Sequence, residues 1–183
     1  IEVSGYRVGE DVFVALDAAA SEFYKKNKYI LNDNNKLLTT DELIDYWGGL
    51  IKNYPIISIE DPFDEDDISR FAKFTNLYGK NLQIVGDDLF VTSEKKLSEG
   101  IQKQAGNSIL IKLNQVGTLT ETLNTISKAK KHNFNTIISH RSGETEDNFI
   151  SDLCVGINAG QIKTGSLSRS DRTSKYNQLL RIE

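Results

Sequence analysis

Several residue types that stabilise or target other classes of protein are rare or missing in this sequence. Its 183 residues include one cysteine, Cys154, two prolines and no methionine. A single cysteine cannot form an internal disulfide, so nothing indicates an oxidising compartment, and we expect a small buried thiol. No segment approaches the roughly 18 apolar residues of a membrane-spanning helix, and no signal peptide is recognisable. We therefore expect a soluble, cytoplasmic protein.

An excess of positive charge is also missing. The 22 lysines and arginines are outnumbered by 26 acidic residues, which gives a formal net charge of −4 at pH 7. This balance argues against nucleic acid as the main partner. The length fits one domain or a large part of one. Because the sequence lacks methionine and begins at Ile1, we expect it to be part of a longer protein.

Short β-branched runs recur at nearly even intervals and predict strands. Each is a continuous apolar stretch of strand length, as expected for strands that are buried on both faces. The predicted strands span residues 12–17, 56–61, 83–88, 109–114, 136–141 and 160–165. Helical patterns lie between them, at residues 40–53, 66–78, 94–103 and 119–132, with Tyr46 and Leu77 among the residues of their apolar faces. The expected start signals are Thr40, Asp66 or Asp67, Ser93 and Thr118. The polar segment 27–39 predicts a small hairpin or excursion before the first full helix.

Strands that alternate with helices indicate an α/β fold with a parallel sheet. Two architectures fit this order. One is an open doubly wound sheet, and the other is a partial TIM-type (β/α) barrel, with about six of eight parallel strands and helices outside. Neither a GxGxxG nor a P-loop fingerprint is present to favour the open sheet. The strand ends favour the barrel, because all of them would meet at one face there, whereas an open sheet spreads them along a line.

Every predicted strand ends in chemically capable side chains, which are Asp17, Glu60, Asp61, Asp87, Asp88, Lys112, Asn114, His140, Arg141, Ser142, Lys163 and Thr164. The carboxylates of Asp17, Glu60 and Asp87 would form a hard oxygen site that suits Mg²⁺ rather than zinc. A lysine near bound divalent cations has a lowered pKa, so Lys112 and Lys163 could act as a base near neutrality. The run from His140 to Ser142 offers donors for a phosphate or carboxylate. Together these groups indicate proton abstraction next to a carboxylate.

Longer motifs occur in a fixed order along the chain: ALDAAASEFY (15–24), SIEDPF (58–63), GDDLFVT (86–92), LIKLNQVG (110–117), SHRSGETED (139–147), GQIKTGS (160–166) and the ending KYNQLLRIE. In this order and spacing, the chain resembles the enolases over essentially its whole length. The wording of GDDLFVT and of GSLSRSDR is more similar to bacterial than to animal members.

The resemblance implies Mg²⁺-dependent, reversible dehydration of 2-phosphoglycerate to phosphoenolpyruvate. This is the phosphopyruvate hydratase reaction of glycolysis, catalysed by a hydro-lyase with two Mg²⁺ per active site in the complete enzyme. The resemblance implies that Asp17, Glu60 and Asp87 are the ligands of the catalytic Mg²⁺ and that Lys112 is the general base. It also assigns substrate binding to Glu60, Lys112, His140, Arg141, Ser142 and Lys163, with Lys163 at the substrate carboxylate.

The acids next to these positions have other expected roles. Asp61 and Asp88 each follow a matched ligand, and neighbours on a strand point to opposite sides. We therefore expect them to be supporting or capping groups. Glu144, Glu146 and Asp147 are expected to begin a helix, where acids suit the helix dipole.

The resemblance further implies that residues 1–183 are the C-terminal catalytic barrel domain of a longer enolase. The N-terminal domain and the first barrel strands would precede it, and the family's general acid, a glutamate, lies in that part. We therefore expect the 183 residues alone to be inactive, and the complete protein to be a homodimer or octamer.

Three other interpretations compete with this one. Another member of the wider superfamily would act on a different carboxylate, but it would not be expected to keep SHRSGETED. A protein displayed at the cell surface would bind host proteins such as plasminogen, as an additional role. A lens-type structural protein would not be expected to retain the carboxylates and lysines of the site.

Overall fold

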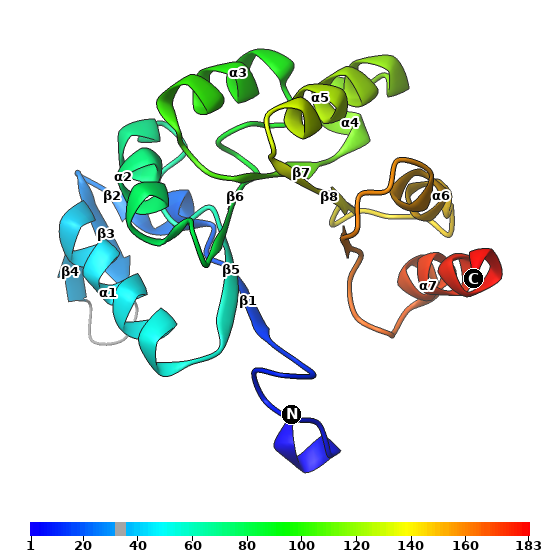
Figure 1. Ribbon diagram of the computed structural model, residues 1–183, viewed down its shortest axis with the longest axis horizontal. Coiled ribbons are helices and arrows are strands. Elements are labelled where there is room, and N and C mark those ends of the chain that lie inside the picture. Colours follow the sequence, from blue (N-terminus) through cyan, green and yellow to red (C-terminus); the bar gives the residue numbers. More distant parts are fainter. Residues whose placement is uncertain (32–35) are drawn as a thin grey trace. The chain divides into compact units, whose positions relative to one another are not determined.

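The computed structural model describes residues 1–31 and 36–183 of the chain. By internal contacts it divides into two compact units. Unit 1 comprises Ile1–Leu89 and Ser98–Asn107, and unit 2 comprises Phe90–Leu97 and Ser108–Glu183. Each unit is described by itself, with the element labels of Figure 1.

Unit 1 contains the N-terminal half of the secondary structure. Its elements are η1 (Glu2–Ser4), β1 (Val14–Asp17), η2 (Ala20–Phe23), β2 (Tyr24–Lys25), β3 (Lys28–Leu31), β4 (Lys36–Leu38), α1 (Thr40–Asn53), β5 (Ile56–Glu60), α2 (Ile68–Tyr78) and β6 (Gln83–Gly86). It also holds the second part of α3 (Glu94–Lys103). Strand β5 pairs in parallel with β1 on one side and with β6 on the other.

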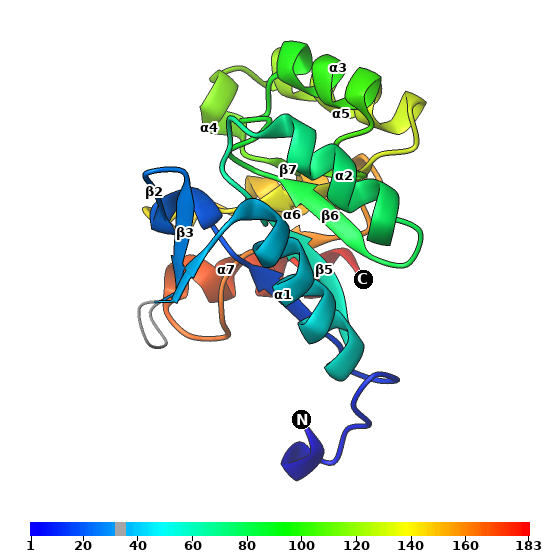
Figure 2. The ribbon, with the colours of Figure 1, turned by 90° about the vertical axis from the view of Figure 1, so that its left-hand side faces the viewer.

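Aromatic side chains fill the core of unit 1. The ring of Phe63 meets those of Phe71 and Phe74 edge to face, with centroids 5.7 and 5.4 Å apart. All three side chains are fully buried. Helix α1 lies against β5 (Figure 2), and its Trp47 donates from Nε1 to the carbonyl of Pro62 at 3.0 Å. The segment that follows β5 is therefore held by packing from α1 and α2.

The segment predicted as a small hairpin forms antiparallel strands. Strand β3 pairs with both β2 and β4, and the connection at residues 32–35 lies outside the described residues. The fully buried Tyr29 anchors this small sheet, because its hydroxyl accepts the backbone N–H of Asp64 at 2.9 Å. Burial raises the pKa of Tyr29 to about 12, so the phenol stays neutral.

Unit 2 contains the first part of α3 and the remaining elements. These are β7 (Ser108–Ile111), α4 (Leu113–Val116), α5 (Leu119–Lys131), β8 (Asn135–Ser139), α6 (Phe149–Gly156), β9 (Ile162–Lys163) and α7 (Ser170–Ile182). Strand β8 pairs in parallel with β7 and with β9. All four residues of β7 are buried, as predicted for a strand covered on both faces.

The α/β class and the predicted order are confirmed. Each unit contributes three parallel strands to the described part of the chain. Helices α1 and α3 span the predicted residues, and Thr118 caps α5 as expected. The cap of α1 is Thr39 rather than Thr40, because Thr39 and Glu42 form a reciprocal capping box.

Several local predictions were wrong. Asn114 was placed on a strand, but β7 ends at Ile111 and Asn114 lies in the short helix α4. Tyr46 and Leu77 were placed on apolar helix faces, yet both are exposed. Helix α7 was not predicted, and a helix in the region of α6 was predicted with its start among residues 144–147. Neither Glu144 nor Glu146 begins a helix, since α6 starts at Phe149.

Candidate functional site

The first two predicted metal ligands are neighbours in the sheet of unit 1. Asp17 and Glu60 are register partners at the ends of the parallel strands β1 and β5. Because side chains alternate along a strand, partners at the same register lie on the same face. Glu60 is only 6% exposed, whereas Asp17 is exposed. The fold therefore places two carboxylates side by side at the carboxyl ends of adjacent strands.

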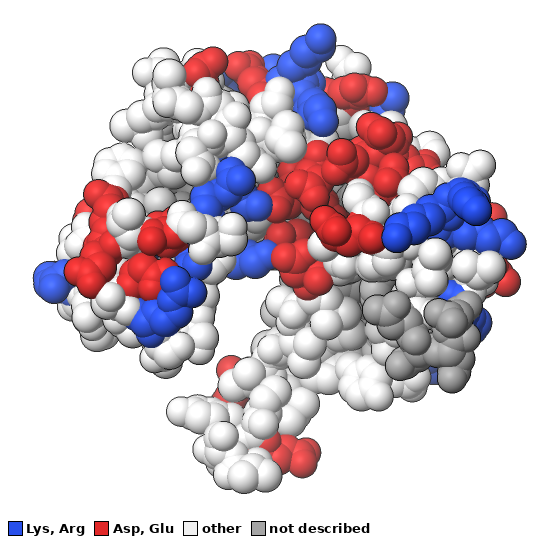
Figure 3. All heavy atoms as spheres, turned by 180° about the vertical axis from the view of Figure 1, so that it is seen from behind, with Lys and Arg blue, Asp and Glu red and all other residues white. Residues whose placement is uncertain are grey.

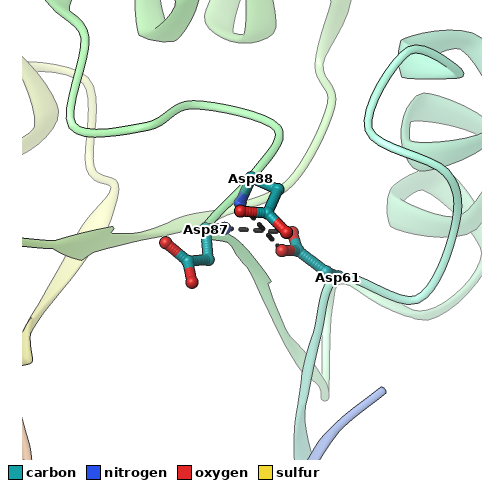
Figure 4. A group of neighbouring side chains, drawn as sticks. All are labelled: Asp61, Asp87 and Asp88. Atoms are coloured by element: carbon teal, nitrogen blue, oxygen red, sulfur yellow. Dashed lines mark hydrogen bonds between the residues drawn. The ribbon is translucent and has the colours of Figure 1, made fainter. Parts of the chain in front are cut away.

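Asp61, which follows β5, links the end of that strand to the end of β6 through hydrogen bonds. Its Oδ1 accepts the backbone N–H of Asp87 at 3.0 Å, and its Oδ2 accepts that of Asp88 at 2.8 Å. Figure 4 shows both bonds, with the Asp88 carboxylate beside that of Asp61 and the Asp87 carboxylate turned to the other side. The backbone of Asp61 has φ of 43°, a region that aspartate tolerates better than most residues. This is the supporting role that we predicted for Asp61.

Burial gives Asp61 an unusual proton affinity. Its pKa is raised to about 7, first because the carboxyl is desolvated and also because Asp87 and Asp88 carry like charges. The two backbone N–H donors act in the opposite direction and favour the carboxylate. Asp61 is thus a buried acid whose oxygens are both committed to amide groups.

A cation would find only oxygen donors in this part of unit 1. Among residues 1–31 and 36–183, one oxygen from each of Asp61, Asp87 and Asp88 lies within 4.8 Å of the others. Of these three, Asp87 alone was predicted as a ligand. The Asp61 oxygens already accept amide hydrogens, so we favour Asp17, Glu60 and Asp87 as donors. Carboxylates without cysteine or histidine fit a hard cation such as Mg²⁺.

The surface charge is also unevenly distributed. Asp and Glu side chains gather in one area of the face seen in Figure 3, and lysines and arginines form separate groups. Such an acidic area raises the local concentration of cations.

Lys112 follows the last residue of β7 and begins α4. Its backbone N–H donates to Thr92 Oγ1 at 2.9 Å, and that hydroxyl donates to Gln115 Oε1 at 2.6 Å. Thr92 is fully buried, and its carbonyl accepts the Thr125 hydroxyl at 2.9 Å. Val91 and Thr92 have φ of 42° and 56°, which is strained for β-branched residues. The backbone of Lys112 is therefore held by a strained turn in which the hydroxyl and carbonyl of Thr92 are both hydrogen-bonded.

The run from His140 to Ser142 follows β8 and is tied to its surroundings by its backbone. The His140 N–H donates to the Lys163 carbonyl at 2.9 Å, which joins the ends of β8 and β9. The Arg141 N–H donates to Glu144 Oε1 at 2.9 Å, and its guanidinium donates to Asn114 Oδ1 at 2.9 Å. Unit 2 thus brings together four predicted substrate-binding residues, His140, Arg141, Ser142 and Lys163.

The pKa of His140 lies below its usual value. Burial is the main cause, and the positive charges of Arg172 and Lys163 add to it. Glu144 and a backbone hydrogen bond with Thr164 act in the opposite direction. The imidazole is therefore neutral at pH 7.

Two buried cations on α7 support this run, and sequence reasoning missed both. Arg172 is 7% exposed and Lys175 is fully buried. Lys175 Nζ donates to the carbonyls of Thr145 and Asp171 at 2.5 and 2.6 Å and lies 3.2 Å from Glu144 Oε2. The signal available in the sequence lay in the motifs GSLSRSDR and KYNQLLRIE, which contain Arg172 and Lys175.

No helix in the described ranges 1–31 and 36–183 is long and apolar enough to cross a membrane.

A comparison with protein families agrees with this arrangement. Residues 1–183 match the model of the enolase C-terminal TIM barrel domain. The match favours the barrel over the open sheet and places the chain among the enolase-type lyases, which act on small molecules. Over its whole length, this chain belongs to the enolase family as a C-terminal TIM barrel domain.

Proposed function

We propose that this chain supplies the catalytic barrel residues for the Mg²⁺-dependent dehydration of 2-phosphoglycerate to phosphoenolpyruvate. The observation that carries the proposal is the set of strand ends. In unit 1 they present Asp17, Glu60 and Asp87, and in unit 2 they present Lys112 and Lys163. Acids alone would suit many cation sites, but acids together with a lysine base suit proton abstraction next to a carboxylate.

Asp17, Glu60 and Asp87 would hold the catalytic Mg²⁺, and a second Mg²⁺ would accompany the substrate. When bound, the cations supply positive charge that offsets the negative charge developing on the substrate carboxylate. The role of Asp61 in this proposal is to fix the backbone that carries Asp87. It does not bind the cation.

The residues of unit 2 would carry the proton and hold the substrate. The amine of Lys112 takes the proton from C2 of 2-phosphoglycerate, and the electron pair moves toward the carboxylate. Lys163 contacts that carboxylate and stabilises the added charge. Arg141 and Ser142 donate to the phosphate, and His140 lies beside them as a neutral imidazole. Hydroxide then leaves C3 and takes a proton from an acid outside this chain.

The same proposal covers the remaining expectations. Residues 1–183 are the C-terminal catalytic domain of an enolase that acts in glycolysis in the cytoplasm as a homodimer or octamer. The general acid is supplied by another part of that protein, so the 183 residues assayed alone should not turn over 2-phosphoglycerate. Substantial turnover by them would contradict this assignment.

The central test is Lys112→Ala in the full-length protein, with 2-phosphoglycerate turnover followed during a Mg²⁺ titration. We expect kcat to fall by at least about 10³-fold, because the base acts on the reacting proton. The Mg²⁺ concentration that gives half-maximal binding should be the same in the variant as in the wild type. Lys128→Ala is a matched control, since Lys128 on α5 pairs with Glu94 on α3 and is not part of the site.

Two outcomes would overturn the proposal. One is a wild-type protein that does not turn over 2-phosphoglycerate at saturating Mg²⁺. The other is a Lys112→Ala variant whose kcat stays within a few-fold of wild type.

A further inference from the structure

Arg172 contacts three consecutive residues of the substrate-binding run, two through their backbone carbonyls and one through its imidazole. Its Nη1 donates to the carbonyl of Arg141 at 3.0 Å, and its Nη2 donates to the carbonyl of Ser142 at 3.1 Å. The same Nη1 is hydrogen-bonded to Nδ1 of His140. One buried guanidinium therefore binds two carbonyls and one imidazole nitrogen of a loop that lies about 30 residues earlier.

These contacts define the tautomer of His140. A guanidinium has only N–H donors and stays charged in proteins, so the His140 Nδ1 must accept. A neutral imidazole that accepts at Nδ1 carries its proton on Nε2. The charge of Arg172 also opposes the addition of a second proton, in the same direction as burial and Lys163. Glu144 and the backbone of Thr164 act against it.

The guanidinium itself is fixed from its other side. Nε lies 3.2 Å from Asp171 Oδ2, and the Asp171 side chain is mostly buried. The methylene groups of Arg172 lie over Gly165, where an added Cβ would come within 2.8 Å of Cδ. Gly165 has φ of 85°, which other residues rarely adopt. Tyr176 donates from its hydroxyl to the Gly165 carbonyl, which fixes this turn to α7.

We propose that Arg172 is a positioning residue, which sets the backbone of residues 140–142 and holds His140 as the neutral tautomer with its proton on Nε2. This inference rests on the proposed function, since it deepens the role of the same substrate-binding run. Arg172 does not touch the substrate in this proposal. It acts through the residues whose carbonyls and ring nitrogen it binds.

The test compares Arg172→Gln and Arg172→Lys in the full-length protein. Lysine keeps the charge but cannot bind three acceptors from one planar group, so it should recover only part of the effect. Arg181→Gln is the control, because Arg181 is exposed on the same helix and donates a hydrogen bond to Gln178. Folding of each variant is checked by urea unfolding before the other measurements.

The decisive readout is the imidazole of His140, followed by ¹⁵N NMR and assigned by the loss of its signals in His140→Gln. In the wild type, Nδ1 should show the shift of an unprotonated nitrogen at pH 7. In Arg172→Gln, the ¹⁵N chemical shifts of the two ring nitrogens should move toward the averaged values of a mixture of tautomers. The pKa of His140 should also rise. We expect kcat/KM for 2-phosphoglycerate to fall about 10- to 100-fold in this variant.

The outcomes separate this inference from the proposed function. If the wild type shows the Nε2–H tautomer but has no activity on 2-phosphoglycerate, the positioning role stands and the proposed substrate is wrong. If Arg172→Gln is folded and leaves the tautomer, the pKa of His140 and kcat/KM at wild-type values, the positioning role is overturned. A drop in stability with an unchanged His140 tautomer would also overturn it, because Arg172 would then be merely structural.

Discussion

The two units fix their functional segments with charges of opposite sign. In unit 1 a buried acid, Asp61, accepts backbone N–H groups of the residues that follow β6. In unit 2 two buried cations, Arg172 and Lys175, donate to backbone carbonyls of the residues that follow β8. Each buried charge thus satisfies the backbone groups that are left over where a strand ends.

The difference matches the chemistry that each segment presents. An acid that binds the backbone amides of Asp87 and Asp88 in unit 1 leaves their side chains available as carboxylates. Cations that bind carbonyls in unit 2 leave the side chains of Arg141 and Ser142 as donors. In each unit the supporting residue has the same charge as a functional side chain that it holds, Asp87 in unit 1 and Arg141 in unit 2. This is possible because the supporting residue binds the backbone of that functional residue, not its side chain.

Removing Lys175 should have the largest effect on stability. Lys175→Met keeps the buried stem but leaves Glu144 and two carbonyls without their cation. Breaking a buried pair in this way costs about 3–5 kcal/mol. We expect urea unfolding of the full-length protein to show a loss of this size. Lys128→Met, which breaks the partly exposed pair with Glu94, should cost about 1 kcal/mol or less. Equal losses in the two variants would show that the buried Lys175 contributes no more to stability than the partly exposed Lys128.

Asp61→Ala should have the next largest effect, in unit 1. It leaves two buried amides without an acceptor, at about 1–3 kcal/mol each. Hydrogen exchange should become faster at the Asp87 and Asp88 amides. Asp61→Asn is the matched variant, because it keeps one acceptor oxygen and places an NH₂ group against the other amide. It should be intermediate. Unchanged exchange at both amides in Asp61→Ala would show that the contact does not hold the turn.

The smallest effect is the pH dependence that His140 adds. Its pKa in the folded protein lies below the ordinary value of 6.5. As pH falls below 6.5, the unfolded chain takes up this proton first, so the free energy of unfolding decreases. Above pH 6.5 the contribution is fully present. His140→Gln should therefore flatten the slope of stability between pH 6.5 and lower pH, as measured by urea unfolding at a series of pH values. A steeper slope in His140→Gln would mean that the sign is wrong.

Much of the fold was predictable because its signals are local. The apolar period of α1 and the capping side chain of Thr118 report on neighbours within one turn. Helix α7 was missed for a physical reason. Its buried positions hold Asp171, Arg172 and Lys175 instead of apolar residues, so its sequence has no apolar period. The error at Asn114 has a similar origin, since α4 is only one turn long and follows directly on a strand.

The candidate site was predictable in its residue types and only partly in its support. Asp17, Glu60, Asp87, Lys112 and Lys163 were named from their places at strand ends and from the resemblance. The register confirms that Asp17 and Glu60 are neighbours, while their binding of a cation stays a prediction. The role of Thr92 behind Lys112 could not be predicted, because it depends on a strained turn and on a bond across 20 residues.

The sequence by itself determined the order of strands and helices, the acids and lysines at the strand ends, and the family of the chain. The tertiary structure decided which backbone groups each buried charge holds. Asp61 reaches amides 26 and 27 residues away, and Arg172 reaches groups 30 to 32 residues away. Periodicity and capping patterns report only on residues within a few turns of each other. Contacts between residues so far apart in the sequence form only when the chain folds. They place the residues after β5 beside those after β6, and α7 beside the residues after β8, so they are visible only in the folded protein.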